Sequence, residues 1–100
     1  MDLVTIQQVE ASDSKDYFPD MEMSVEFLAI CLAGKTGEAC NDIKKYLRGD
    51  FDFVELSGRL RKELPDILIY LVMLADMAGI NLETAYHNKK EFNDQRYRKT

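Results

Sequence analysis

The hydrophobic positions of this chain recur mainly at helical spacing, and they are densest in one stretch of the second half. From residue 67 to 75 nearly every side chain is apolar, so a helix there has no face suited to water and should be buried among other helices. Asp66 and Asp76 close the run, which is too short for a membrane span of about twenty apolar residues. The pattern predicts a central helix over residues 54–79, with Asp52 as its N-cap.

A second amphipathic pattern precedes it and predicts a helix over residues 21–47, with Asp20 as N-cap and Gly49 as the stop. The apolar positions recur at three-, four- and seven-residue steps: Val25, Leu28, Leu32, Ala39, Ile43 and Leu47. Gly34 and Gly37 lie inside this helix, where each glycine costs about 1 kcal/mol. Their presence predicts the close approach of another backbone or of a ligand, because a glycine leaves room that a side chain would fill.

The remaining segments carry weaker patterns. Residues 3–11 predict a short helix that ends at the polar stretch 12–16, and residues 82–97 predict a last helix capped by Asn81. Pro65 inside the central pattern predicts a kink or the start of a new helix. Since no segment alternates as a strand does, the predicted fold class is all-α, a bundle of three main helices with a short helix before them.

Length and composition bound the organisation of the chain. One hundred residues indicate a single domain, 1–100, with an N-terminal arm at 1–20 and a helical core at 21–97. So few helices cannot cover an all-apolar central helix, so we expect a homo-oligomer, a dimer or a tetramer, that completes the bundle.

Charge and cysteine usage exclude several classes of protein. The net charge of −5 argues against a general nucleic-acid-binding surface, although five basic residues against two acidic ones follow from His87 onward. The first residues lack a basic leader and an apolar signal core, so we expect a cytoplasmic protein that uses no membrane. Cys31 and Cys40 are about 13 Å apart along one predicted helix, which favours two reduced thiols.

Three carboxylates are the candidate chemistry. Glu63 and Asp66 are spaced i, i+3 at the start of the apolar run, and Glu38 lies near the middle of the preceding helix. Antiparallel packing would bring the three together, and ligation by oxygen alone favours Mg²⁺, with Mn²⁺ as an alternative. The same spacing is also common on solvated helix faces, so both interpretations stand on spacing alone.

At these residues the chain resembles the all-α nucleoside triphosphate pyrophosphohydrolases of the MazG type. The resemblance covers residues 29–97 and rests on four stretches: Gly34-Lys35-Thr36-Gly37-Glu38, Glu63-Leu64-Pro65-Asp66-Ile67-Leu68-Ile69-Tyr70-Leu71, Gly79-Ile80-Asn81-Leu82-Glu83, and Lys89-Lys90-Glu91-Phe92-Asn93-Asp94-Gln95-Arg96-Tyr97. It implies an enzyme that hydrolyses a nucleoside triphosphate to the monophosphate and pyrophosphate.

The resemblance also implies roles for individual residues. Glu38, Glu63 and Asp66 become metal ligands and catalytic residues, which hold Mg²⁺ on the triphosphate. The implied substrate-binding residues are Lys35, Lys89, Asn93, Arg96, Tyr70 and Tyr97. For the basic residues the alternative is a solvated face, and for Tyr70 it is core packing.

Two positions depart from the family pattern. Lys35 stands where the family has the first glutamate of Glu-x-x-Glu, and Pro65 stands where a small helix former is usual. Lys35 either pairs with Glu38 and weakens the metal site or contacts a phosphate in place of a second metal. Two alternatives to an active enzyme follow: a catalytically impaired homologue that binds nucleotide, and a structural helical interaction protein.

Overall fold

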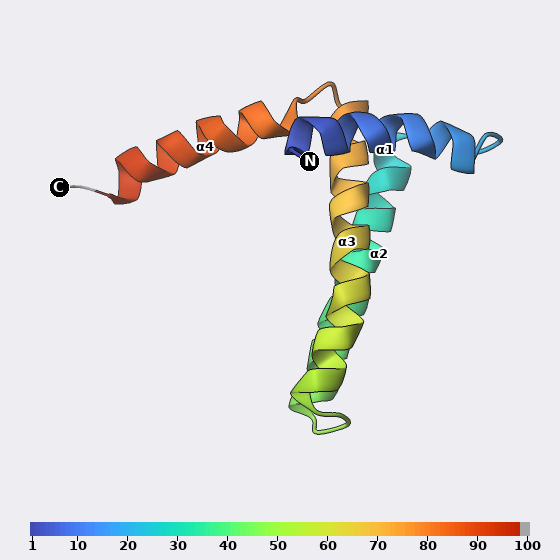
Figure 1. The fold of residues 1–100 in the computed structure, drawn as a ribbon, viewed down its shortest axis with the longest axis vertical. Coiled ribbons are helices and arrows are strands. Elements are labelled where there is room, and N and C mark those ends of the chain that lie inside the picture. The colour runs from blue at the N-terminus through green and yellow to red at the C-terminus, as the bar shows by residue number, and fades with distance from the viewer. Residues whose placement is uncertain (99–100) are drawn as a thin grey trace.

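The computed structural model describes residues 1–98, which form four helices and no strand. They are α1 (Leu3–Tyr17), α2 (Val25–Leu47), α3 (Phe53–Met77) and α4 (Leu82–Tyr97). The all-α prediction is confirmed for this part of the chain. Figure 1 shows the two long helices overlapping as one column, with α1 lying across its upper end and α4 leading away from it.

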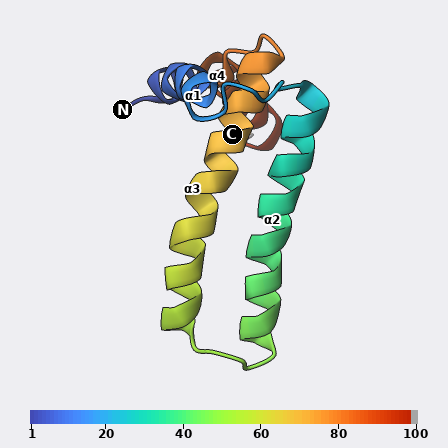
Figure 2. The ribbon, with the colours of Figure 1, turned by 90° about the vertical axis from the view of Figure 1, so that its right-hand side faces the viewer.

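The column is an antiparallel hairpin of α2 and α3 (Figure 2). Gly49 reverses the chain after α2 with a φ of 89°, a left-handed conformation that glycine adopts without strain. The Asp52 side chain then accepts a hydrogen bond from the Glu55 N–H and caps α3. The stop at Gly49 and the cap at Asp52 are both as predicted. The buried hydrophobic side chains among residues 1–98 all belong to this hairpin: Leu28, Ala39, Leu56, Val72, Met73 and Ala75.

The first helix is longer than its sequence predicts. The stretch 12–16 does not break it, because α1 continues to Tyr17, and the Ser14 hydroxyl donates to the Ala11 carbonyl within the helix. The predicted cap at Asp20 is also wrong. Ser24 caps α2 instead, accepting from the Phe27 N–H.

A buried glutamine joins α1 to the turn between α3 and α4. The Gln7 side-chain amide donates to the Ile80 carbonyl at 2.7 Å, and its oxygen accepts from the Leu82 N–H at 3.1 Å. Gln7 is 8% exposed and is the only buried polar residue among those described. Asn81, which lies between the two residues that Gln7 contacts, caps α4 as predicted. The chain bends by 98° between α3 and α4. Gln7 therefore fixes α1 and the origin of α4 together.

We expect Gln7→Ala to destabilise the fold by about 1–3 kcal/mol, because it leaves the Ile80 carbonyl and the Leu82 N–H without their partner. In a domain of this size that lowers the melting temperature by roughly 4 °C or more. Thermal denaturation followed by circular dichroism measures the change. The control is Gln8→Ala at the exposed neighbouring position, which should stay within about 0.5 kcal/mol of the parent. Equal melting temperatures for the two variants would contradict the role of Gln7.

The central helix differs from its prediction in two ways. It runs unbroken through Pro65, so the prediction of a new helix there is wrong. Pro65 has no N–H to donate to the Arg61 carbonyl. Both residues are exposed, so water can solvate that carbonyl instead. Its burial is also incomplete within this chain: Val72 is fully buried, but Leu68 and Leu71 are each 38% exposed.

The predicted close approach at the two glycines of α2 is not made by another backbone in residues 1–98. A Cβ placed on Gly34 or Gly37 would meet no atom within 4 Å. Both positions face open space. The prediction that a ligand approaches them remains untested.

No individual helix in residues 1–98 has both the length and the apolar composition needed to cross a membrane. By length and composition alone, α3 and α4 would qualify only as a bent pair.

Candidate functional site

The hairpin brings together the three carboxylates that sequence spacing singled out. Lys35 and Glu38 project from the middle of α2, opposite Glu63 and Asp66 on α3. The Lys35 Nζ lies 3.5 Å from a Glu38 carboxylate oxygen and 3.4 Å from an Asp66 carboxylate oxygen. Antiparallel packing thus places the lysine between carboxylates of both helices. We call Lys35, Glu38, Glu63 and Asp66 the carboxylate–lysine cluster.

Charge within the cluster changes the protonation of two of its members. The Glu38 carboxylate, followed by the hydrogen bond to Asp66, raises the pKa of Lys35 above its usual value. Loss of solvation raises the pKa of Glu63, and the neighbouring Glu38 adds to this effect, while Lys35 opposes it. The Glu63 Oε2 atom is buried and has no hydrogen-bond partner in residues 1–98. An orphaned carboxylate oxygen of this kind is where a cation, a water or a proton would be stabilised.

The donor set fits a hard divalent cation, although the site is not preformed. In the described part of the chain no three acidic, histidine or cysteine side chains are already placed to hold an ion. The available donors are carboxylate oxygens, which Mg²⁺ and Mn²⁺ prefer, and Glu63 has an oxygen free to bind. The Lys35 ammonium occupies the place between Glu38 and Asp66 that a cation would take, so it must move away for an ion to enter.

Tyr70 lies one turn beyond Asp66 and faces the same side of the hairpin as Lys35. A cavity of about 230 Å³ touches Lys35, Asp66 and Tyr70 and extends to α1. Partial burial raises the pKa of Tyr70, with Cys31 beside it as the next cause, so the phenol stays protonated at neutral pH. Tyr70 therefore lies beside the candidate site, and its role in substrate binding stays a prediction.

Sequence reasoning missed Arg59. Its guanidinium lies 3.3 Å from Asp42 on α2 and 3.1 Å from Glu55, and it covers the Phe51 ring at 4.3 Å. A cavity of about 360 Å³ touches both Arg59 and Glu63. The sequence indicated that Arg59 lies near Glu63, because their i, i+4 spacing places them on one face of α3.

The basic residues of α4 are not brought to the cluster within this chain. Figure 1 shows α4 leading away from the hairpin, and no residue of α4 is buried. Lys89 and Arg96 instead lie over Phe92 and Tyr97 of their own helix, at 4.8 and 5.2 Å from the ring centroids. Within one chain, Lys89, Asn93, Arg96 and Tyr97 do not lie beside the carboxylates, and their predicted role in substrate binding stays a prediction.

A phage protein is similar enough in sequence to place the chain in a family. The Gene 37 protein of Mycobacterium phage L5 is 31% identical over 87 residues, a match that spans 81% of this chain and 76% of the phage protein. The chain belongs to the Gene 37 family. Neither a family model nor a solved structure matches the sequence. The printed name of the Gene 37 relative states no ligand or reaction, so the functional argument for this family member rests on its own site.

Proposed function

We propose that this Gene 37 family member is a cytoplasmic, Mg²⁺-dependent nucleoside triphosphate pyrophosphohydrolase of the MazG type. The observation that carries the proposal is that Glu38 and Asp66, from two helices, both contact the Lys35 ammonium, with Glu63 next to Glu38. The family that the sequence resembles uses carboxylates at these three positions. The substrate is a nucleoside triphosphate, and the products are the monophosphate and pyrophosphate.

Each residue has a role in this proposal. Glu38, Glu63 and Asp66 would hold Mg²⁺, or Mn²⁺ in its place. When bound, the ion neutralises phosphate oxygens and makes a water molecule more nucleophilic. Once released from the carboxylates, the Lys35 ammonium can donate to a phosphate oxygen.

An oligomer is part of the proposal, and the shape of the chain supports it. The accessible surface is 7418 Å², whereas a compact monomer of 11.5 kDa exposes about 5,800 Å². The radius of gyration is 16.6 Å, against about 13 Å for a compact chain of this length. The excess of roughly 1,600 Å² is comparable to what one subunit buries in an obligate dimer.

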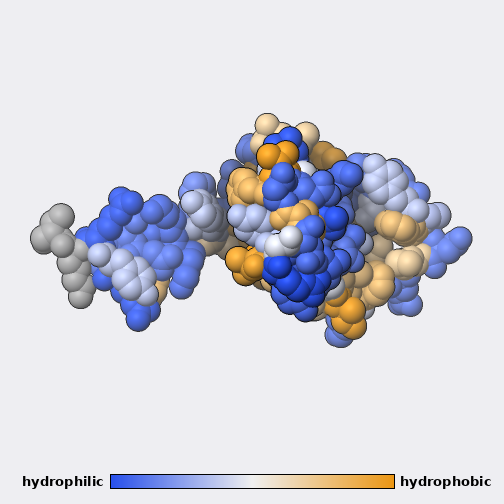
Figure 3. Space-filling view, turned by 90° about the horizontal axis from the view of Figure 1, so that it is seen from below, coloured by the Kyte–Doolittle hydropathy of each residue, from blue (hydrophilic) through white to orange (hydrophobic). Residues whose placement is uncertain are grey.

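The exposed groups support one arrangement for a second copy in this proposal. Leu64, Leu68 and Leu71 form an apolar stripe along α3, and Figure 3 shows hydrophobic surface on the hairpin as seen from its loop end. The α4 arm in the same view is mostly hydrophilic, and its basic residues Lys89, Lys90 and Arg96 are balanced by three acidic ones on the same helix. In the proposed dimer or tetramer, α4 of one copy lies against the hairpin of another, which brings Lys89, Asn93 and Arg96 to the carboxylates.

We expect sedimentation at micromolar concentration to give a dimer or a tetramer. Leu68→Glu should shift the distribution to monomer, because it places a charge in the apolar stripe. Ser12→Glu, on the exposed side of α1, adds the same charge elsewhere and should leave the oligomer intact. A folded parent that sediments as a monomer would refute this part of the proposal.

The proposed activity is tested by pyrophosphate release from a panel of canonical and modified triphosphates, with Mg²⁺, with Mn²⁺ and with a chelator. Metal-dependent release from at least one substrate is the expected result. The two ion pairs of Lys35 with Glu38 and Asp66 favour a second candidate, a nucleotide-binding homologue without turnover. Metal-dependent binding without release would identify that candidate. Neither binding nor release would leave a structural interaction protein.

A further inference from the structure

The cavity of about 230 Å³ beside Lys35 has one wall that the resemblance does not explain. Its first wall is α3, through Asp66, Ile69, Tyr70 and Met73. Its second wall comes from α1 and the residue that follows it, through Glu10, Ser14, Tyr17 and Phe18. Lys35, a member of the carboxylate–lysine cluster, lies at one end of the cavity. A molecule anchored by phosphate at Lys35 would therefore extend toward α1.

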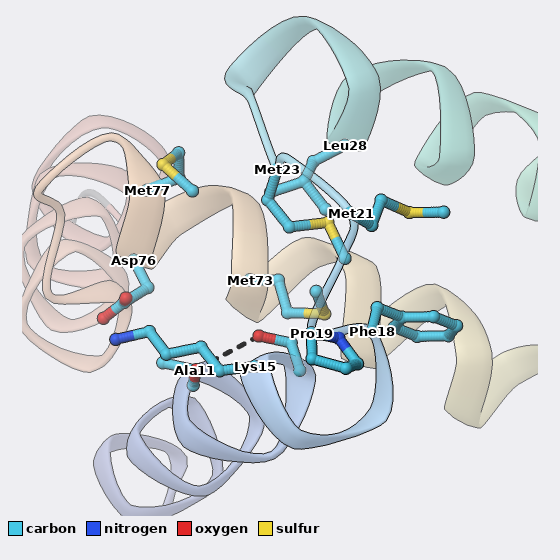
Figure 4. A pocket seen from close by; sticks show the side chains of 11 residues that line it. Ala11, Lys15, Phe18, Pro19, Met21, Met23, Leu28, Met73, Asp76 and Met77 are labelled. Atoms are coloured by element: carbon cyan, nitrogen blue, oxygen red, sulfur yellow. Dashed lines mark hydrogen bonds between the residues drawn. The ribbon is translucent and has the colours of Figure 1, made fainter.

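The size and lining of this cavity suit a single flat ring system. Its volume is below the roughly 300 Å³ at which pockets for drug-sized ligands begin. Tyr17, Phe18 and Tyr70 offer aromatic surface, and bases of every kind stack on aromatic faces. Phe18 and Met73, both labelled in Figure 4, also line the neighbouring cavity of about 280 Å³ between α1 and the hairpin. Methionine side chains adapt easily, so this shared wall can adjust to a ring.

Glu10 and Ser14 present hydrogen-bond acceptors to the cavity, whereas the Tyr17 hydroxyl at the end of α1 can donate or accept. The Glu10 carboxylate only accepts, and it makes no hydrogen bond or ion pair within residues 1–98. The Ser14 hydroxyl donates its proton to the Ala11 carbonyl at 3.0 Å, which leaves its oxygen as an acceptor. A ligand group that lies against Glu10 and Ser14 must therefore be a donor, because two acceptors facing each other repel.

We infer that the α1 wall recognises the base of the nucleotide and selects a base with an exocyclic amino group, with Glu10 as the acceptor for that group. This inference rests on the proposed function. Cytosine presents an amino group at the position where uracil presents a carbonyl oxygen, and the two rings are of equal size. Glu10 accepts from the amino group of cytosine and repels the carbonyl oxygen of uracil.

The first experiment measures binding of cytidine and uridine without metal, by NMR chemical shifts of the α1 amides. It requires no hydrolysis, so it succeeds or fails independently of the proposed enzyme activity. The second experiment compares kcat/KM for cytidine triphosphate and uridine triphosphate with Mg²⁺. In both we expect a preference of roughly tenfold or more for the cytosine ligand.

Glu10→Gln is the informative variant, because glutamine keeps the shape of the side chain and adds a donor for the uracil oxygen. It should bring the cytosine and uracil ligands to about equal binding and equal kcat/KM. Asp16→Asn removes the same charge from an exposed position on α1 that does not touch the cavity, and it should retain the preference of the parent.

The possible outcomes separate the two proposals. Hydrolysis without a preference for the amino group, or a preference that Glu10→Gln leaves unchanged, would overturn the role of Glu10 while the enzyme assignment stands. Selective cytidine binding without hydrolysis of any triphosphate would support the base site and refute the activity. If neither nucleoside shifts the α1 amides, or if Asp16→Asn acts like Glu10→Gln, the base site is wrong.

Discussion

Replacing Asp66 with asparagine, or Glu63 with glutamine, should lower metal-dependent pyrophosphate release by more than about a hundredfold while the helix content stays at the parent level. Each substitution keeps the shape of the side chain but removes the negative charge that would hold the ion. The two carboxylates lie one turn apart in the interior of one continuous helix, so neither change disturbs a cap. Pyrophosphate release at saturating Mg²⁺ and far-ultraviolet circular dichroism measure the two quantities.

Glu63→Gln carries a second expectation that separates function from stability. Burial raises the pKa of Glu63, so the charged form is disfavoured in the folded state, and a neutral glutamine removes that penalty at neutral pH. The inactive variant should therefore melt at or above the melting temperature of the parent at pH 7 without metal. Its advantage should shrink as the pH falls through the raised pKa toward the unfolded value of 4.5, because the parent carboxyl is then protonated too.

A matched substitution controls for the loss of one negative charge. Glu22→Gln lies in the exposed connection between α1 and α2 and should leave pyrophosphate release and its Mg²⁺ dependence unchanged. If Asp66→Asn and Glu63→Gln both hydrolyse triphosphates like this control, the carboxylates are solvated surface groups and the metal-site proposal fails.

Local signals in the sequence predicted the hairpin and the cluster well. Asp52 and Asn81 cap their helices, and Gly49 ends α2, because each acts on a backbone group within a few residues. The convergence of Glu38, Glu63 and Asp66 followed from helix periodicity and a short connection, which together make neighbouring helices antiparallel. A pattern of this kind fixes which face of a helix a residue occupies.

Features that depend on distant partners were not predictable in the same way. The position of α4 relative to α1 depends on Gln7, whose hydrogen bonds reach Ile80 and Leu82, more than seventy residues away. No local pattern marks such a pair. Leu68 is exposed although its helix was expected to be buried. The cause is related, because the prediction assumed covering helices that a single chain does not contain.

Lys35→Glu should increase Mg²⁺ affinity and turnover, and this substitution decides how the proposed site works. The Lys35 ammonium lies 3.5 Å from Glu38 and 3.4 Å from Asp66, where it competes with a divalent ion for the same oxygens. Glutamate at this position removes the competitor and adds a ligand, which suits an ion that demands near-octahedral oxygen coordination. Without metal, the substitution places four carboxylates close together, and their repulsion should lower the melting temperature below that of the parent at low salt. Added Mg²⁺ should restore the melting temperature.

Titration of Mg²⁺ against melting temperature and activity, in the parent, Lys35→Glu and Lys35→Gln, separates the causes. An ion at ten times its Kd stabilises the folded state by about 1.4 kcal/mol, a rise of roughly 6–11 °C in a domain of this size. Lys35→Gln removes the competitor without adding a ligand, so its Mg²⁺ midpoint should fall between those of the other two proteins. If lysine instead contacts phosphate, both variants should lose triphosphate affinity, and Lys35→Glu should lose more because its carboxylate repels the phosphates. Identical Mg²⁺ dependence in all three proteins would place the ion elsewhere, because a charge reversal between two ligating carboxylates cannot leave their affinity for a divalent cation unchanged.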